Sequence, residues 1–401
     1  MSKARRLRRE RHVLHGILAT GAACMFGLGV GLAAAELLVR LGVPEQEFWS
    51  VAPVYHPVET PGVHYTLEPS LDETVYGVDL RTNGLGFRGP DWATPKPAGT
   101  FRIALVGDSH GFGLGVPFRA TAGEVATRLL RRCTGRDVEV ANLAINGYNS
   151  AQELAVLRAY ALALEPDLIV IQVSSNDHDP GPYADITGYL IGVPPPGLGA
   201  DSWGPTSTRA LLRGLTHSRL YLWGRRQYLA WRDQGTPQSS PTQNGPPPID
   251  PDWMGAIDDL PPPASLDVVV GQPLRAMIAD AKSANVAVVL ASYASPLEYR
   301  RLLREITRAE GIPWLEILAI FPEAHSYPEL LKRFGLGWDP HLGAAAHERW
   351  GRALARLIRG SGYLPSARPA TPGCDESRAS WSGTKLQPGS DEAANRSTIN
   401  P

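Results

Sequence analysis

Ser109 is the residue of this chain best placed to act as a nucleophile. It stands in the run IALVGDSHG, residues 103–111, where four apolar residues lead into a loop flanked by Gly107 and Gly111. Such an apolar run is typical of a strand buried on both faces in a parallel sheet. The glycines permit a sharp turn that exposes the serine hydroxyl at the carboxyl edge of that sheet. The alternative is that Ser109 only caps the next helix, because Ser and Asp are favoured cap residues anywhere.

Acyl transfer by a serine needs a base, a group that orients the base, and donors for the oxyanion. Three later loops contain such residues. Gly147 can turn its backbone N–H toward the serine, Asn176 can donate a side-chain amide, and Asp339 and His341 place an acid beside an imidazole. Taken singly, these residues are a turn glycine, two caps and a surface histidine. Their joint placement after expected strands favours the catalytic interpretation.

The elements that must position these residues alternate between strands and helices from residue 101 onward. Strands are expected at 101–106, 138–143, 167–173, 286–292 and 313–318, and helices near 120–132, 150–163, 266–284, 296–310 and 343–359. This alternation predicts an α/β fold with a five-stranded parallel sheet and helices on both faces. Because open α/β sheets keep their sites at the carboxyl ends of the strands, the four loops are expected to converge there.

An uncharged apolar stretch runs from residue 13 to residue 35. As a helix it is long enough to cross the roughly 30 Å of a bilayer's hydrocarbon core. The basic segment at 1–12 then predicts a cytoplasmic N-terminus and an extracytoplasmic remainder. The alternative is a cleaved signal peptide, because Ala33-Ala34-Ala35 resembles a cleavage site, but the stretch exceeds a usual apolar core of about 7 to 15 residues. We therefore expect a retained, single-pass transmembrane anchor in the cell membrane.

The remaining segments differ in composition. Residues 36–100 are interpreted as a stalk and lead-in, 101–365 as the main domain, and 366–401 as a disordered tail with little to bury. A Pro-rich insertion at about 180–265 surrounds one amphipathic helix candidate at 208–232, and is either a lid or substrate platform or a tolerated surface insertion. The formal net charge of −1 gives no sign of a nucleic-acid partner.

Four blocks of this sequence resemble, in order, the motifs of the SGNH/GDSL hydrolases: Gly107-Asp108-Ser109, the Gly147 loop, Asn176-Asp177, and the Asp339/His341 pair. The run NGLGFRG at 83–89 resembles the lead-in of membrane-anchored bacterial members. This resemblance implies a flavodoxin-like three-layer α/β/α sandwich and a serine esterase or related acyltransferase. It implies neither a cofactor nor a metal.

The same resemblance assigns roles to the residues. Ser109 is the expected nucleophile, His341 the base and Asp339 the orienting acid, while the Ser109 N–H, the Gly147 N–H and the Asn176 side chain are the expected oxyanion hole. These roles agree with the chemistry, because a hydroxyl is a poor nucleophile until an imidazole takes its proton.

The sequence departs from the family pattern at three places. His110 stands where the family has leucine, Ser175 replaces the glycine common before the asparagine, and the acid and histidine are two residues apart where many members have three. Pro340 stiffens that short link. If Asp339 does not orient the histidine, a Ser/His dyad with a backbone carbonyl remains possible, and His347 is an alternative base.

We expect an esterase that removes short acyl groups from a carbohydrate or small ester. The alternatives are an O-acyltransferase acting on an envelope polysaccharide and a non-catalytic envelope-binding protein on the same scaffold. A metal site at Asp177-His178-Asp179 is disfavoured, because ligands that close in one loop seldom converge on one ion. A nucleotide site at residues 111–115 lacks both the dinucleotide spacing and the P-loop lysine.

Overall fold

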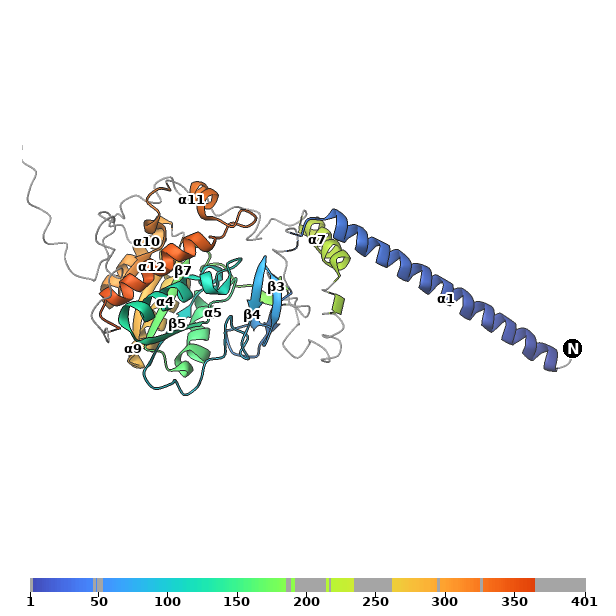
Figure 1. Cartoon of the computed structure of the whole chain (residues 1–401), viewed down its shortest axis with the longest axis horizontal. Coiled ribbons are helices and arrows are strands. Elements are labelled where there is room, and N and C mark those ends of the chain that lie inside the picture. The colour runs from blue at the N-terminus through green and yellow to red at the C-terminus, as the bar shows by residue number, and fades with distance from the viewer. Residues whose placement is uncertain are drawn as a thin grey trace, which may run out of the picture. The chain divides into compact units, whose positions relative to one another are not determined.

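The structure is a computed structural model that describes residues 3–45, 48, 53–184, 189–191, 214–215, 218–233, 262–293, 296–324 and 327–364. The chain forms two compact units: Met1–Val51 with Pro205–Gln238, and Ala52–Gly204 with Ser239–Pro401. The tail expected at 366–401 and most of the insertion at about 180–265 lie outside the described residues. Figure 1 shows the described elements in colour.

The second unit is built on a five-stranded sheet in which every pairing is parallel. The strands are β5 (Thr100–Val106), β6 (Asp137–Asn142), β7 (Leu168–Ser174), β10 (Ala287–Tyr293) and β11 (Trp314–Glu316). Their spatial order is β11-β10-β7-β5-β6, so the second strand lies outside the first and the others follow on its opposite side. This is the flavodoxin-like order, as predicted.

Helices cover both faces of this sheet and complete three layers. On one face, α4 (Ala122–Thr134) and α12 (Ala344–Gly360) share a core with Ile103 and Leu105. On the other, α5 (Ser150–Val156), α9 (Gln272–Ser283) and α10 (Leu297–Glu310) share a core with Ala104 and Val106. Successive residues of β5 thus enter opposite cores, as the two-residue period of a strand requires. The predicted three-layer sandwich is confirmed.

Short elements connect and extend the regular ones. They are α3 (Ser109–Phe112), η1 (Phe118–Ala120), the π turn η2 (Leu157–Ala161) and η3 (Leu162–Leu164) after α5, β8 (Tyr183–Ala184), β9 (Leu190–Ile191), α8 (Ala264–Leu266) and the π turn η5 (Asp267–Gly271) before α9, η6 (Leu318–Ile320) and α11 (Tyr327–Phe334).

Two antiparallel pairs precede the sheet and belong to the second unit. They are β1 (Tyr55–Pro57) with β2 (Tyr65–Leu67), and β3 (Asp72–Val75) with β4 (Val78–Arg81). The Tyr65 hydroxyl donates to the Asn146 carbonyl at 2.9 Å, and the Tyr148 hydroxyl donates to the Tyr65 carbonyl. The second unit begins at Ala52 and so includes the lead-in, whose Tyr65 is hydrogen-bonded to the loop after β6.

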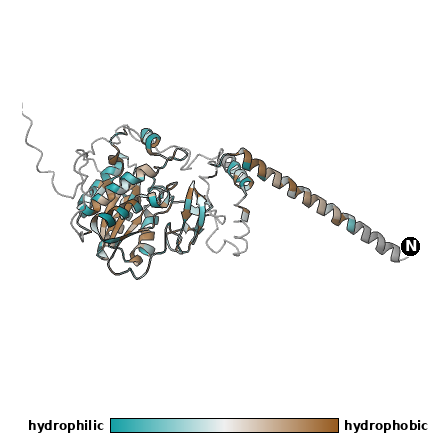
Figure 2. Ribbon diagram, in the orientation of Figure 1, coloured by the Kyte–Doolittle hydropathy of each residue, from teal (hydrophilic) through white to brown (hydrophobic). Residues whose placement is uncertain are grey.

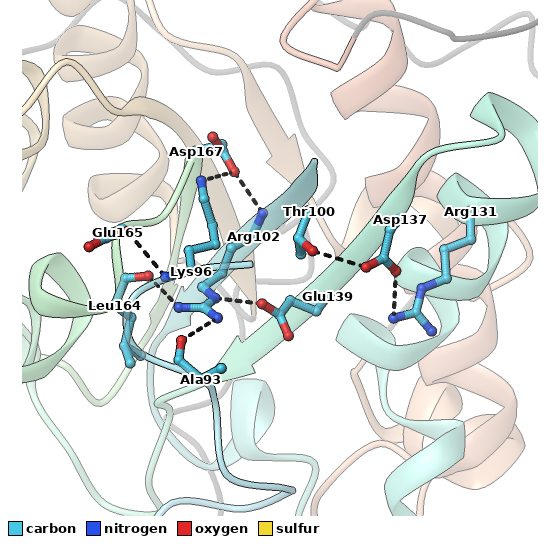
Figure 3. A network of polar contacts seen from close by, with 10 residues as sticks. All are labelled: Ala93, Lys96, Thr100, Arg102, Arg131, Asp137, Glu139, Leu164, Glu165 and Asp167. Carbon is cyan, nitrogen blue, oxygen red and sulfur yellow. Dashed lines mark hydrogen bonds and ion pairs between the residues drawn. The ribbon is translucent and has the colours of Figure 1, made fainter. Parts of the chain in front are cut away.

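A polar network closes the amino end of the sheet (Figure 3). Arg102 on β5 is fully buried, and its guanidinium donates to Glu139 at 2.6 Å and to the carbonyls of Leu164 and Ala93 at 2.5 and 2.9 Å. Asp167 accepts from the Arg102 backbone N–H at 2.8 Å. Every donor nitrogen of the Arg102 guanidinium thus has a partner, which offsets the cost of burying a charge.

The first unit contains α1 (Lys3–Gly42) and α7 (Arg219–Asp233). Among the described residues, one helix is long and apolar enough to cross a membrane, the 28-residue segment His15–Gly42 of α1, which is almost wholly exposed. Figure 2 shows the hydrophobic colour along it. This segment contains most of the predicted anchor at 13–35. Helix α7 falls within the helix candidate at 208–232 except for its last residue, and its first residue is Arg219.

Candidate active site

Ser109 begins α3 directly after β5, and a buried glutamine on the neighbouring strand holds this turn. Gln172 of β7 accepts hydrogen bonds through Oε1 from the backbone N–H groups of Asp108 at 3.1 Å and Gly111 at 2.9 Å. Its amide nitrogen donates to the Ser174 hydroxyl at 2.6 Å. Gln172 therefore fixes the backbone on both sides of the serine. Gln172 is not among the site residues predicted from the sequence, although a single polar residue within the apolar run LIVIQV is a visible signal.

The two glycines that flank the serine are needed to make room for that glutamine. A Cβ at Gly107 would lie 2.5 Å from Gln172 Oε1, and one at Gly111 would lie 3.0 Å from the same atom. Neither glycine has a positive φ. The sequence pattern predicts that these glycines permit a sharp turn, whereas in the structure glycine is needed because the Gln172 side chain approaches closely.

The structure brings Ser109, His341 and Asp339 together in one hydrogen-bonded row. His341 Nε2 lies 2.7 Å from Ser109 Oγ, and His341 Nδ1 is hydrogen-bonded to Asp339 Oδ1. The histidine and the aspartate are each 19 % exposed. Asp339 and His341 therefore form their hydrogen bond although they are two residues apart, with Pro340 between them, and not three as in many members of the family.

The loop that carries this pair is held at both ends. Leu336 donates its backbone N–H to the His341 carbonyl at 3.0 Å, and an antiparallel bridge joins Gly335 to Leu342. The Tyr327 hydroxyl of α11 donates to the Pro340 carbonyl at 2.9 Å. These bonds restrict the backbone on both sides of the imidazole, so His341 is presented to the serine by a fixed loop.

The three expected oxyanion donors have unused hydrogen-bonding capacity. Within the described part of the chain, the Ser109 N–H, the Gly147 N–H and the side-chain amide of the half-buried Asn176 have no hydrogen-bond partner. Gly147 has φ +84°, and a Cβ there would lie 2.9 Å from Pro182 Cγ. Glycine at this position is therefore required both by backbone conformation and by space.

Two further polar residues tie neighbouring elements to α3. Asn142, at the end of β6, donates to the Gly111 carbonyl at 3.0 Å. Arg88 from the lead-in is buried and donates to the carbonyls of Phe112 at 3.1 Å, Gly113 at 2.7 Å and Val116 at 2.6 Å. Burial lowers the pKa of Arg88 to about 10, so the guanidinium stays charged at neutral pH. The lead-in thus anchors the far end of the nucleophile helix.

His110 packs its ring between Tyr293 and the imidazole of His341. The centroids of the two histidine rings lie 4.7 Å apart. Burial, followed by the proximity of His341, lowers the pKa of His110 well below its ordinary value, so the ring is neutral at neutral pH. A neutral imidazole therefore lies beside the expected base, at the sequence position where the family pattern has leucine.

Three carboxyl groups that interact electrostatically with one another are buried: Asp108, Glu153 and Asp177. Burial raises the pKa of Glu153 and of Asp177 well above the usual range. Repulsion from neighbouring carboxylates is the second cause and raises both pKa values further. The Ser150 hydroxyl donates to Asp177 at 3.3 Å, while no hydrogen bond reaches either Glu153 oxygen from the described residues. Burial and the repulsion between neighbouring carboxylates therefore oppose the simultaneous ionisation of Glu153 and Asp177.

Two rival assignments lose support. His347 is buried and its Nδ1 accepts from the Ala122 N–H at 3.2 Å, so it faces α4, and burial lowers its pKa to about 3. In the Asp177-His178-Asp179 run, Asp177 is bound to Ser150 while His178 Nδ1 lies 2.7 Å from the Tyr299 hydroxyl. Among the described residues, no group of three metal-ligating side chains could hold an ion.

Comparison with solved structures finds similar chains, whereas no protein-family model and no curated protein matches the sequence. A lipolytic protein of the G-D-S-L family from Desulfitobacterium hafniense DCB-2 is 13 % identical, with 64 % of this chain and 98 % of that chain covered and a TM-score of 0.35. A lipase/acylhydrolase from Enterococcus faecalis is 14 % identical, with 65 % and 96 % covered and a TM-score of 0.37. Axe2, an acetylxylan esterase from Geobacillus stearothermophilus, is 15 % identical, with 67 % and 97 % covered and a TM-score of 0.35.

Proposed function

We propose that this protein is a serine esterase of SGNH type in which Ser109 is the nucleophile, His341 the base and Asp339 the orienting acid. The observation that carries the proposal is the row of hydrogen bonds from Ser109 Oγ through both ring nitrogens of His341 to Asp339. A serine, an imidazole and a carboxylate in this order are the parts that acyl transfer requires.

In the proposed reaction, His341 Nε2 takes the hydroxyl proton of Ser109 as Oγ attacks the acyl carbonyl of the ester. The Ser109 and Gly147 N–H groups and the Asn176 amide are the proposed donors to the resulting oxyanion. His341 then returns the proton to the leaving alcohol, and a covalent acyl-serine remains. Water, deprotonated by the same imidazole, attacks this intermediate; His341 then gives that proton to Ser109 Oγ as the acid leaves, which restores the free serine. Preorganised donors matter here, because each one typically contributes about 100- to 1,000-fold in rate.

We infer further that α1 anchors the protein in the cell membrane and that the second unit is extracytoplasmic. The length of the apolar helix and the basic residues before it support this topology. We also propose that the substrate is a short acyl ester of a carbohydrate or small alcohol, because no long apolar lid is evident in the sequence.

The test is covalent labelling with a fluorophosphonate probe, followed by peptide mapping and by assays on p-nitrophenyl acetate. The expected adduct is on Ser109, and Ser109→Ala is expected to lose labelling and turnover while it keeps the wild-type circular dichroism spectrum. Ser361→Ala, at the end of α12, is the matched control. Wild-type turnover in Ser109→Ala would contradict the nucleophile assignment. Absence of any ester turnover in the wild type would favour a binding protein, and acyl transfer to a sugar in place of water would indicate an acyltransferase.

A further inference from the structure

Helix α7 of the first unit has an uncovered aromatic face. Trp223 is 40 % exposed, Tyr228 57 % and Trp231 69 %. At 3.6 residues per turn these three side chains fall within one side of the helix, and the rings of Tyr228 and Trp231 are 6.1 Å apart. Leu222 lies on the opposite side and is buried. Within the first unit, α7 therefore buries one side and leaves three large aromatic side chains uncovered.

The first turn of α7 is bonded to the carboxyl end of the apolar helix. Glu36 of α1 accepts hydrogen bonds from the Ser218 hydroxyl at 2.8 Å and from the backbone N–H groups of Arg219 at 2.9 Å and Leu220 at 2.8 Å. Arg219 also pairs with Glu45 at 3.3 Å. These bonds satisfy donors that a helix N-terminus leaves free, and the carboxylate interacts favourably with the helix dipole.

The position of Glu36 sets the depth of α7 relative to a bilayer. Glu36 is the first charged residue after the uncharged stretch that ends at Ala35. A carboxylate is costly in hydrocarbon, so in a chain that spans the membrane through α1 it lies at the boundary between lipid tails and headgroups. Helix α7, which begins at this carboxylate, must then begin at the same depth.

The composition of α7 suits that depth. Its sequence, RLYLWGRRQYLAWRD, combines four arginines with two tryptophans and two tyrosines. Trp and Tyr are enriched where the bilayer meets water, and arginine is attracted to anionic headgroups. Amphipathic helices with Trp or Leu on one face and basic residues on the other lie in the plane of this interface.

We propose that α7 is an interfacial helix whose Trp223, Tyr228 and Trp231 face lies in the headgroup region of the bilayer that α1 crosses. The proposal rests on the anchoring role of α1. The partner is a phospholipid surface that contains anionic lipids. The helix gives the first unit a second point of contact with that surface, beyond the spanning helix itself.

The test uses the full-length protein in vesicles of phosphatidylcholine and phosphatidylglycerol, with and without brominated acyl chains that quench nearby tryptophan. The wild type is compared with Trp223→Phe/Trp231→Phe and with the control Trp92→Phe/Trp314→Phe, whose substitutions lie in the second unit. The α7 variant is expected to lose at least half of the emission that brominated lipid quenches in the wild type. The control is expected to keep all of it.

Two results would overturn the proposal, and they differ in what else they affect. In the first, brominated lipid quenches the same emission in the wild type and the α7 variant, and the protein stays in the vesicles after an alkaline carbonate wash. This would mean that protein covers the aromatic face of α7, while α1 still anchors the chain. Release of the protein in that wash would remove the anchoring role of α1 together with the interfacial helix. The assignment of Ser109 is independent of both results.

Discussion

Replacing Asp339 by Asn removes one negative charge from the proposed triad and leaves its shape nearly unchanged. His341 becomes an imidazolium when it takes the Ser109 proton, and Asp339 is the carboxylate that contacts that ring. Both side chains are 19 % exposed, which favours an effective dielectric constant between those of the interior and bulk water. At a value of about 20, two unit charges about 4 Å apart interact by about 4 kcal/mol. Because about 1.4 kcal/mol corresponds to a tenfold change in rate, kcat should fall by about 1,000-fold.

The assay is steady-state hydrolysis of p-nitrophenyl acetate by the wild type and Asp339→Asn, with circular dichroism to verify the fold. The loss should appear in kcat with little change in KM, because the lost interaction develops only as the imidazolium forms. Asp179→Asn removes a carboxylate from beside another histidine, His178, and is the matched control. A fall in kcat of less than about tenfold in correctly folded Asp339→Asn would refute the electrostatic argument and favour a Ser/His dyad oriented by another group.

Four other substitutions test the site and its surroundings. Gln172→Met leaves two buried N–H groups unpaired, each costing about 1–3 kcal/mol, so urea denaturation should show a loss of about 2–6 kcal/mol, and an unchanged midpoint would contradict this role. The pKa of Glu153 is raised in the folded state, so its contribution to the free energy of unfolding is lost as the pH rises above the ordinary pKa of a glutamate and is restored as the pH falls back toward it. The difference in stability between the wild type and Glu153→Gln should therefore change with pH, by up to about 1.4 kcal/mol per pH unit, and thermal melts that give a pH-independent difference would exclude the effect. His347→Gln should keep esterase turnover near the wild-type rate while His341→Gln loses it, and the opposite pattern in the same assay would make the buried histidine the base.

Much of the architecture follows from local pattern in the chain. Runs such as the one ending at Val106 are apolar without alternation, and this property alone indicates strands buried on both faces. The loops that contain Ser109, Asn176 and His341 each lie next to a strand or helix. They also occur along the chain in the same order as the family motifs. Short-range periodicity and motif order are readable from one sequence, because they depend on neighbours a few residues away.

The contacts that make the site rigid depend on which elements become neighbours in space. Gln172 reaches the serine turn only because β7 pairs with β5, more than sixty residues away in the chain. The Asp339/His341 contact required the loop before α12 to fold around Pro340, and neither residue type nor spacing reveals that conformation. Tyr65 and Arg88 join the lead-in to the site through hydrogen bonds. Such contacts follow from strand order and side-chain packing, which arise only when distant segments bury their apolar faces together.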